Sequence, residues 1–406
     1  MSHITQMPDT SAQLPALVVG GGIAGLAAAL ALSQQGQAVQ LLEQADQIGT
    51  IGYGVQIGPN IAPMMEKLGI ADAVKKASYL PEQILLYEAY TGDRLAHIPL
   101  RTPEFHARYQ QLPYIAIHRV DLHEILLAAC KQQPHIALSQ STTVVDYSAE
   151  QDHVKVVTEQ GEAIYGKGLI AADGLRSKLR SRLNPSDAPR DTGYVAHRTI
   201  IPMKDAPASL QKRQGVTMWT GDGFHVIYYP LRNATELNLV LVVRLPEGVH
   251  NISDEAYKVH IDELMQQVTP EARDAMALMN LERRWAIADR TPIRHWSQGR
   301  MTLLGDSAHA TLQSLAQGAG MAFEDALVLS ELVKKHGDDF SSAFKELQRL
   351  RFLRTSRVQL ESRALWDVYH CAGVDAEVRT QQFKEKTPED FYRCLDWLWQ
   401  PISLSV

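Results

Sequence analysis

Three features that mark common protein classes are scarce in this 406-residue sequence. Its three cysteines, Cys130, Cys371 and Cys394, lie far apart and form no CxxC pair. This argues against a disulfide framework or a cysteine zinc site, so we expect no metal centre. No apolar run approaches the ~18 residues that a membrane span needs. The 40 basic residues are outnumbered by 46 acidic ones, a net charge of −6, whereas nucleic-acid-binding proteins usually carry a basic surplus.

The beginning of the chain lacks the features of a signal peptide, because residues 1–15 contain no lysine, no arginine and no apolar core. We therefore interpret 1–14 as a disordered tail and expect a cytoplasmic protein. Hydrophobic residues make up 45% of the chain and charged residues 21%, which is typical of a soluble globular protein. The length favours two domains.

A strand–turn–helix–strand unit follows the tail. The sequence predicts an apolar strand over 16–19, an alanine- and leucine-rich helix over 23–35 and a second strand over 38–42. The first turn reads Gly20-Gly21-Gly22-Ile23-Ala24-Gly25, and Glu43 ends the second strand. This order is typical of a βαβ unit that binds a dinucleotide, either FAD or NAD.

Each of these residues has a physical role in such a unit. Gly20 permits the tight turn, Gly22 lets the backbone approach the diphosphate, and Gly25 lets helix and strand pack closely. The N-terminus of the helix directs unpaired N–H groups at the diphosphate. The Glu43 carboxylate is placed to accept hydrogen bonds from the ribose hydroxyls, which disfavours NADP at this site.

Two later strands end in a similar way. An apolar strand predicted over 169–172 is followed by Asp173-Gly174, a pattern that on its own also fits a simple strand-to-helix turn. A second strand, predicted over 301–304, precedes Gly305-Asp306. Gly318-Ala319-Gly320 then leads into a predicted helix.

Together these segments resemble the single-component FAD-dependent aromatic hydroxylases, the group that includes salicylate and para-hydroxybenzoate hydroxylases. The resemblance extends from about residue 14 to beyond residue 325. It implies an α/β fold with a discontinuous Rossmann-like FAD-binding domain, an inserted β-rich substrate domain and a C-terminal helical segment. We place the FAD-binding domain at 15–86, 108–189 and 285–370, the substrate domain at 87–107 and 190–284, and the C-terminal segment at 371–406.

The resemblance also implies which residues hold FAD. In that family the glycine loop binds the ADP half, the Asp-Gly turn is linked to both FAD and NAD(P)H, and the Gly-Asp aspartate holds the ribityl chain. Arg119 lies in a segment similar to the family's arginine segment. The turn from Gly318 to Gly320 precedes a helix predicted from about residue 321 to 335, and it places backbone N–H groups at the helix start, which suits the negatively charged edge of reduced flavin. The expected FAD-binding residues are Gly20, Gly22, Gly25, Glu43, Arg119, Asp173, Gly174, Asp306, Gly318 and Gly320.

The chain has no second glycine-rich βαβ unit. This disfavours a reductase with two dinucleotide sites. In the family that the chain resembles, NAD(P)H binds transiently and without a Rossmann domain of its own. We therefore expect bound FAD, with NADH as a transient co-substrate and O2 as the oxidant.

One loop narrows the resemblance. Many members of the family read Gly-Asp-Ala-Ala-His-Pro-x-x-Pro, whereas Gln313 stands here at the last position. Glutamine brings an amide donor and acceptor where proline offers only shape. This loop and the ending at 395–399 look like those of 3-hydroxybenzoate 6-hydroxylases. The expected substrate is then a small aromatic carboxylate.

The segment from about 190 to 284 has the alternating pattern of β-strands. Within the strand predicted over 224–231, His225, Ile227 and Tyr229 share one face, with His225 and Tyr229 about 13 Å apart at ~3.3 Å per residue. The two polar residues could bracket a benzoate ring. The alternative is an ordinary sheet histidine and a core tyrosine.

The resemblance implies an electrophilic C4a-hydroperoxide of the flavin, which attacks an electron-rich ring carbon. Removing the phenol proton activates the ortho and para positions, so a base is needed near the hydroxyl. His225, with an ordinary pKa near ~6.5, suits that task. We expect Tyr229 to orient the ring and Gln313 to hold the phenol oxygen or the peroxide.

His197 and Arg198 form a second candidate pair. Arg198 either binds the substrate carboxylate through two hydrogen bonds or lies on the solvent face of its strand. For His309, which follows the Gly-Asp turn, we expect a structural role.

The C-terminal part begins with a long helix predicted over 341–370. Its arginines form either a solvated face or a guide for anionic NADH and substrate. Trp366, Trp397 and Trp399 are expected to pack on the body of the protein or on a second subunit. A homodimer is therefore a further expectation.

The leading hypothesis is an NADH-dependent FAD monooxygenase that hydroxylates 3-hydroxybenzoate para to its hydroxyl to give gentisate. Salicylate 1-hydroxylase and 6-hydroxynicotinate 3-hydroxylase are alternatives within the class. An NAD-dependent dehydrogenase without flavin and a non-catalytic flavin-binding sensor are alternatives from other classes.

Overall fold

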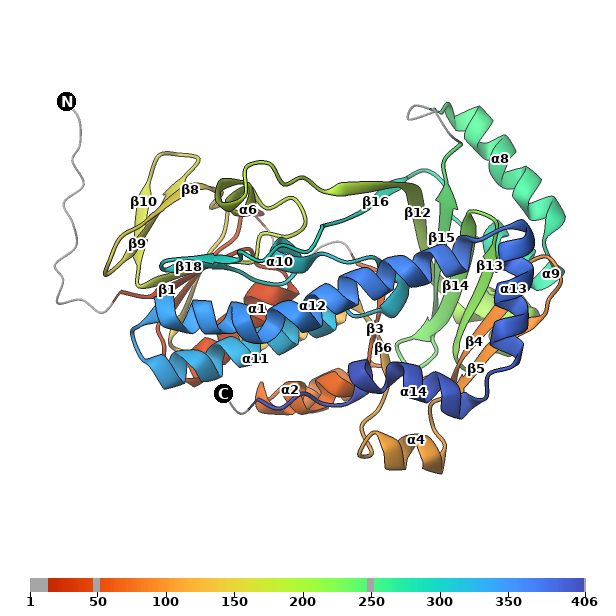
Figure 1. Ribbon diagram of the computed structural model, residues 1–406, viewed down its shortest axis with the longest axis horizontal. Helices are drawn as coiled ribbons and strands as arrows, with labels where there is room; N and C mark the ends of the chain where they lie inside the picture. Colours follow the sequence, from red (N-terminus) through yellow and green to blue (C-terminus); the bar gives the residue numbers. More distant parts are fainter. Residues whose placement is uncertain (1–13, 47–51, 247–251, 405–406) are drawn as a thin grey trace.

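The computed structural model describes residues 14–46, 52–246 and 252–404. The tail predicted over 1–14 lies, except for Leu14, outside these residues. In the described part of the chain, no helix is both long and apolar enough to cross a lipid bilayer. Two large sheets stand at opposite ends of the molecule, and one long helix runs along both (Figure 1).

The first large sheet has six strands, and β1 lies near its middle. The paired strands β1, β2, β7, β11 and β18 are all parallel, as expected of a Rossmann-like fold. Only the short β17 runs antiparallel. The order is β17 (Ser297–Gln298), β18 (Met301–Leu303), β11 (Gly168–Ala171), β1 (Ala16–Val19), β2 (Val39–Leu42) and β7 (Ile136–Ser139).

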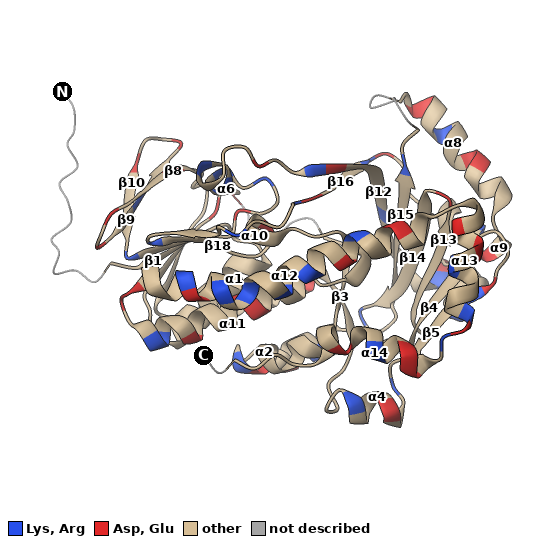
Figure 2. Cartoon of the chain, viewed as in Figure 1, with Lys and Arg blue, Asp and Glu red and all other residues tan. Residues whose placement is uncertain are grey.

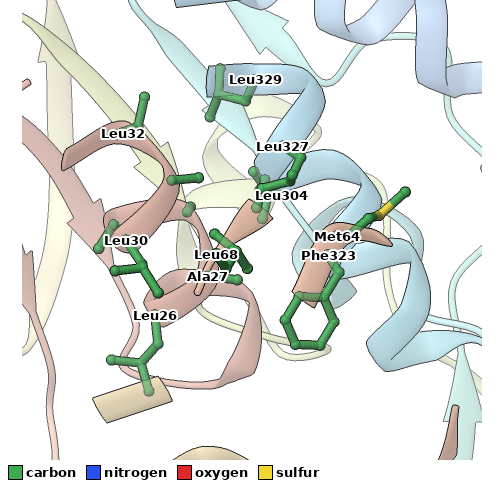
Figure 3. Close-up of a cluster of buried hydrophobic side chains, with 14 of the residues drawn as sticks. Leu26, Ala27, Leu30, Leu32, Met64, Leu68, Leu304, Phe323, Leu327 and Leu329 are labelled. Atoms are coloured by element: carbon green, nitrogen blue, oxygen red, sulfur yellow. The ribbon is translucent and has the colours of Figure 1, made fainter. Parts of the chain in front are cut away.

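Helices cover one face of this sheet. Helix α1 (Ile23–Gln34) is buried on all sides because alanine and leucine dominate it, and it packs against α11 (Gly318–His336). Figure 3 shows Leu26, Ala27 and Leu30 in the same cluster as Phe323 and Leu327 of α11. Helix α5 (Arg119–Lys131) packs beside α1. The start of α1 is thereby held rigidly at the end of β1.

The second large sheet has seven strands drawn from distant parts of the chain. Strand β13 pairs in parallel with β4, while its other neighbour β14 is antiparallel. A two-residue turn at Asp222 and Gly223 joins β13 to β14. The order is β16 (Trp285–Asp289), β12 (Arg190–Pro202), β15 (Glu236–Arg244), β14 (Phe224–Leu231), β13 (Val216–Gly221), β4 (Gln83–Glu88) and β5 (Arg94–Pro99).

These observations confirm the α/β class and the inserted β-rich part. The domain boundaries stay a prediction, and the seven-stranded sheet extends beyond two of them, from Gln83 to Asp289. Smaller elements complete the two ends. They are β8 (Val144–Ala149), β9 (Val154–Thr158) and β10 (Ala163–Gly166) in one sheet, the pair β3 (Gly54–Ile57) and β6 (Ile115–His118), and helices α2 (Ala62–Lys67), α3 (Ala71–Ala77), α4 (Pro103–Arg108), α6 (Lys178–Leu183), α7 (Ala208–Gln211), α8 (Asp254–Gln267), α9 (Pro270–Ala277) and α10 (Asp306–His309).

Helix α12 (Phe340–His370) joins the two ends of the molecule (Figure 1). It contacts β17 and β18 of the first sheet and β13 and β14 of the second. Two shorter helices follow, α13 (Gly373–Lys384) and α14 (Pro388–Trp399). Trp399 packs against Phe105, Tyr109 and Tyr114, so the aromatic C-terminal part lies on the body of the protein.

Candidate active site

Three predicted cofactor loops meet at one edge of the six-stranded sheet. Strands β1, β11 and β18 are parallel neighbours, so the loops that follow them lie side by side. These loops begin at Gly20, Asp173 and Gly305. The sequence separates them by more than 100 residues each time, and the sheet brings them together.

The glycines of the first loop differ in what surrounds them. Gly20 has a φ of +106°, and a Cβ there would lie 2.4 Å from the Ala172 carbonyl oxygen. A Cβ on Gly25 would lie 1.9 Å from the Gly20 carbonyl oxygen. A Cβ on Gly22 would meet nothing within 4 Å. Gly20 and Gly25 are therefore required by the fold itself, whereas Gly22 faces open space at the start of α1.

Several features of this edge fit a dinucleotide. Gly174, like Gly22, faces open space, and Oδ1 of Asp173 is buried without a hydrogen-bond partner in the described chain. Burial raises the pKa of the Asp173 carboxyl. The Glu43 carboxylate accepts hydrogen bonds from the backbone N–H groups of Gly21 and Ala45, which fixes it beside the glycine turn. Open space flanked by polar groups suits a diphosphate and its ribose.

The Gly-Asp turn presents a second set of polar groups. Asp306 keeps exposed surface, and partial loss of hydration among its many neighbours raises the pKa of its carboxyl, against the nearby charges of His309 and Arg119. A Cβ on Gly318 would lie 4.0 Å from Oδ1 of Asp306, so the start of α11 faces this carboxylate. Asp306, Gly318 and Arg119 thus gather at one place, as expected.

A buried ion cluster supports the turn from behind. Asp325 accepts from His309 Nε2 and from Arg351 Nε, with distances of 2.5 and 2.7 Å. Glu324 pairs with Arg351 and with Arg354. His309 therefore has the structural role predicted for it. The sequence left open whether the arginines of the helix predicted over 341–370 form a solvated face. The structure shows Arg351 fully buried in this cluster, and Figure 2 shows acidic and basic residues interspersed on α11 and α12.

The candidate catalytic residues gather on one face of the seven-stranded sheet. We call His225, Tyr229, Arg198 and Gln313 the His225 cluster. Arg198 Nη2 donates to Oε1 of Gln313 at 3.1 Å, and Nε2 of Gln313 lies 3.5 Å from Nε2 of His225. The Arg119 charge contributes to lowering the pKa of Arg198, which burial lowers first. Arg119 therefore acts electrostatically on both Asp306 and the His225 cluster.

The ionisation of this cluster follows from its burial. Burial, and then the Arg198 charge, lowers the pKa of His225 to about 3, so its imidazole is neutral at physiological pH. Burial raises the pKa of Tyr229 to about 12, against the Arg198 charge, so its hydroxyl keeps its proton. No carboxylate of the described residues forms an ion pair with Arg198. The cluster thus combines an uncompensated cation, a neutral imidazole and a phenol.

The alternatives for the pair His197 and Arg198 are settled by the pleat of β12. His197 is fully buried on the opposite face, where its Nε2 lies 2.7 Å from the Tyr257 hydroxyl. His197 is therefore wrong as a site candidate. Arg198 points to Gln313 and its guanidinium carbon lies 5.9 Å from the centre of the Tyr53 ring, so the solvent-face alternative for Arg198 is also wrong.

Sequence comparison identifies the family. The model of the FAD binding domain family matches residues 13–336. A 3-hydroxybenzoate 6-hydroxylase of Polaromonas naphthalenivorans (strain CJ2) is 40% identical over 397 residues, 97% of each chain. A 3-hydroxybenzoate 6-hydroxylase of Klebsiella oxytoca is 35% identical, over 95% of this chain and 96% of the relative.

The chain belongs to the FAD-dependent aromatic hydroxylases. The crystal structure of Klebsiella pneumoniae HpxO complexed with FAD and uric acid has the same fold, with a TM-score of 0.83, 25% sequence identity and coverage of 96% of this chain and 98% of that one. The hydroxylase therefore binds FAD, and NAD(P)H is the typical co-substrate of its class. A dehydrogenase without flavin is excluded.

Sequence reasoning missed three parts of this hydroxylase site. His370, the last residue of α12, lies with its Nε2 2.7 Å from Nδ1 of His225. Gly54 of β3 has room only for hydrogen, because a Cβ would lie 2.5 Å from the Tyr229 ring, and its N–H donates to Asn238. Tyr53 lies beside Arg198. None has a sequence signal, because each contact joins segments far apart in the chain. A separate cavity of about 440 Å³ beside α2 and α3 contains none of the predicted site residues.

Proposed function

We propose that this hydroxylase converts 3-hydroxybenzoate to gentisate. The balanced reaction is 3-hydroxybenzoate, O2, NADH and a proton giving 2,5-dihydroxybenzoate, water and NAD+. The observation that carries the proposal is the His225 cluster, in which an uncompensated arginine and a neutral histidine are bridged by Gln313. The activity named for the 40% identical relative has the matching chemistry, since its substrate carries one carboxylate and one phenol.

Arg198 is assigned to the substrate carboxylate. A guanidinium donates two parallel hydrogen bonds to a carboxylate, and such charge-assisted bonds are among the strongest in proteins. Within the described residues, the Arg198 side chain donates only to the neutral amide of Gln313, so an anionic ligand compensates its charge. An aromatic substrate without a carboxylate cannot provide this compensation of the Arg198 charge.

His225 is assigned as the base that accepts the phenol proton. Its depressed pKa keeps the imidazole unprotonated and ready to accept, but also makes it a weak base. One cause of that depression is the Arg198 charge, which the bound carboxylate neutralises. Substrate binding therefore raises the pKa of His225 and strengthens the base when it is needed.

Tyr229 and Gln313 are assigned to orienting the ring. The Tyr229 hydroxyl stays protonated and is a donor over the whole working pH range. Gln313 is held by Arg198 through its carbonyl, so its amide N–H groups remain directed toward the His225 side. An amide donor there stabilises the negative charge that develops on the phenol oxygen.

FAD, when bound and reduced by NADH, activates O2 and supplies the oxygen atom for the ring. Backbone N–H groups at the start of α1 face the open space beside Gly22 and suit the diphosphate. The start of α11 favours negative charge on the flavin ring. The proposed FAD-binding residues are Gly20, Gly22, Gly25, Glu43, Arg119, Asp173, Gly174, Asp306, Gly318 and Gly320.

We also propose the division into an FAD-binding domain at 15–86, 108–189 and 285–370 and a substrate domain at 87–107 and 190–284. A cytoplasmic location fits the need for NADH and the three free cysteines.

A homodimer is supported by exposed apolar side chains on α12 and α13, Leu353, Leu360 and Val374 among them. Light scattering coupled to size exclusion tests the dimer.

The test of the function is NADH oxidation by the FAD-loaded protein with chromatography of the products. Gentisate formed in step with NADH supports the proposal. Stimulation only by salicylate or 6-hydroxynicotinate replaces the substrate and keeps the class. NADH oxidation unaffected by all three compounds contradicts the proposal and favours a flavin-binding sensor.

A further inference from the structure

The proposed base, His225, is hydrogen-bonded to a second buried histidine from a distant segment of the chain. Nδ1 of His225 lies 2.7 Å from Nε2 of His370, and the two rings are nearly parallel. His225 comes from β14 and His370 is the final residue of α12. Two nitrogens at this distance are joined by a single N–H, so one ring donates and the other accepts.

The direction of this hydrogen bond is set from the other side of His225. Arg198 can only donate, so it fixes the carbonyl oxygen of Gln313 on its own side. The amide N–H group of Gln313 is then the atom that faces Nε2 of His225 at 3.5 Å. Nε2 of His225 must therefore be bare, and its proton must reside on Nδ1.

The ring of His370 is neutral and buried. Burial, and then His225, lowers the pKa of His370 to about 2, and its Nδ1 has no hydrogen-bond partner among the described residues. With Nε2 accepting from His225, the His370 proton resides on Nδ1. The ring is held by Trp366 and Tyr194, with centroid distances of 4.6 and 4.7 Å.

The end of α12 is itself fixed. The His370 carbonyl accepts from the N–H of Gly223 in the turn between β13 and β14. The neighbouring charged and titratable groups are Arg198 and Tyr194 of β12, Arg244 of β15 and Tyr369 of α12. None of these is a carboxylate, so His370 is the group positioned to accept from Nδ1 of His225.

We propose that His370 is a positioning residue that locks His225 in the Nδ1–H tautomer and shares the positive charge of His225 after proton transfer. The lock leaves Nε2 of His225 as an acceptor directed at the substrate side. In the opposite tautomer Nε2 carries a proton and cannot take one from a phenol. The part that concerns catalysis rests on the proposed function, whereas the tautomer does not.

The first experiment reads the tautomer by 15N NMR of the histidine-labelled, oxidised FAD-loaded protein without substrate, with His225→Asn to assign the signals. Wild type is expected to show Nδ1–H on His225. The variant His370→Leu is expected to lose this preference, and His370→Gln, whose amide oxygen can still accept, is expected to keep it. A wild-type His225 protonated at Nε2 overturns the proposal.

The second experiment measures the kinetic consequence with 3-hydroxybenzoate. We expect His370→Leu to lower kcat for gentisate by about 10-fold to 100-fold, less than the ~10²–10⁴-fold contribution of a base itself, with KM nearly unchanged. His370→Gln should recover most of kcat. Tyr194→Phe, which keeps the ring against His370, is the control and should match wild type.

The two proposals fail in different ways. If wild type forms no gentisate, the proposed function fails, and the tautomer measurement still decides the role of His370. If wild type forms gentisate while His370→Leu retains kcat and its pH profile, the positioning role is overturned and the function stands. If His370→Leu does not fold, the wild-type tautomer still decides.

Discussion

At the scale of single residues, the pleat of the strands decides which buried histidine faces the candidate site. His225 and His197 lie on adjacent regions of one sheet, both buried, yet they face opposite sides. One is directed at Gln313 and the other at Tyr257. The two residues therefore form a matched pair for mutation.

We expect His225→Asn to lower the rate of gentisate formation by about 10²–10⁴-fold, because the phenol keeps its proton. NADH should still reduce the flavin. The matched variant His197→Asn should retain catalysis and lose only stability. Product chromatography beside NADH consumption measures both, and full coupled turnover in His225→Asn would assign the proton to another group.

The positive charge of Arg198 should affect both which substrates are turned over and how tightly they bind. We expect 3-hydroxybenzyl alcohol, which lacks the carboxylate, to be turned over with a lower kcat, because the Arg198 charge then keeps the pKa of His225 low. In Arg198→Met, 3-hydroxybenzoate should bind about 10-fold to 100-fold more weakly, the range for a hydrogen bond to a charged group. Titration of the flavin absorbance measures binding. Equal kcat for both substrates in wild type would contradict the coupling.

At individual positions, the sequence predicts those features that a local pattern of residues determines. The shared face of His225 and Tyr229 follows from alternation in one strand, and the structure has them on that face. The sequence left open which side of its strand Arg198 faces, because a strand has two faces and only the packing of the whole sheet decides which of them is buried. His370 could not be found, since it lies 145 positions after His225 and the sequence carries no repeating signal for that contact.

At the scale of elements, the turn between β1 and α1 separates folding from binding. Gly25 has no room for a side chain, whereas Gly22 has an extended φ of −76° and open space around it. One glycine serves the packing of the helix, and the other leaves room for a ligand.

We expect Gly22→Val to fold like wild type without FAD and to lose the rise in Tm that FAD gives. Saturation to 100 times Kd corresponds to about 2.7 kcal/mol of stabilisation in wild type. Gly25→Ala should destabilise the apoprotein itself, because the added methyl group overlaps the Gly20 carbonyl. Thermal melting with and without FAD measures both, and an unchanged FAD response in Gly22→Val would place the diphosphate elsewhere.

Helix α12 offers a second matched pair. Arg351 is buried between Glu324 and Asp325, and Arg349, two residues earlier, makes an exposed pair with Glu346. Removing one partner of a buried pair leaves an uncompensated charge, so Arg351→Met should cost about 3–5 kcal/mol. Arg349→Met should cost at most about 1 kcal/mol. Urea unfolding measures the difference, and similar losses would mean that the cluster is not needed for stability.

At the scale of the whole molecule, α12, the helix that contacts both large sheets, is held to α11 through charges as well as packing. Burial acts to raise the pKa of Asp325, but His309 and Arg351 outweigh it and lower that pKa to about 2. The Glu324 pKa is lowered by Arg351 and Arg354, again against burial. Because both carboxyls titrate lower in the folded protein, their contribution is complete above the ordinary carboxyl pKa.

We therefore expect this contribution to disappear as the pH falls from about 4 to about 2. The stability difference between wild type and Asp325→Asn should shrink across that window and stay constant between pH 6 and pH 8. Urea unfolding at each pH measures it. A difference that persists at pH 2 would mean that the ion pairs are not its source.

The overall architecture was largely open to sequence reasoning, because the βαβ unit, the strands at 190–245 and the helix ending at residue 370 each carry a clear period. The long-range pairings were not. Strand β4 joins β13 across more than 120 residues, and nothing in either strand identifies its partner.

The meeting of loops from residues 20, 173, 306 and 318 has a consequence for how the cell makes this protein. A ribosome adds about 5–20 residues per second, so the glycine turn waits roughly 15–60 s before the last of these loops exists. A nascent chain that ends before residue 318 therefore lacks part of the proposed flavin site. We expect cofactor loading only late in synthesis, after more than three quarters of the 406 residues have been added.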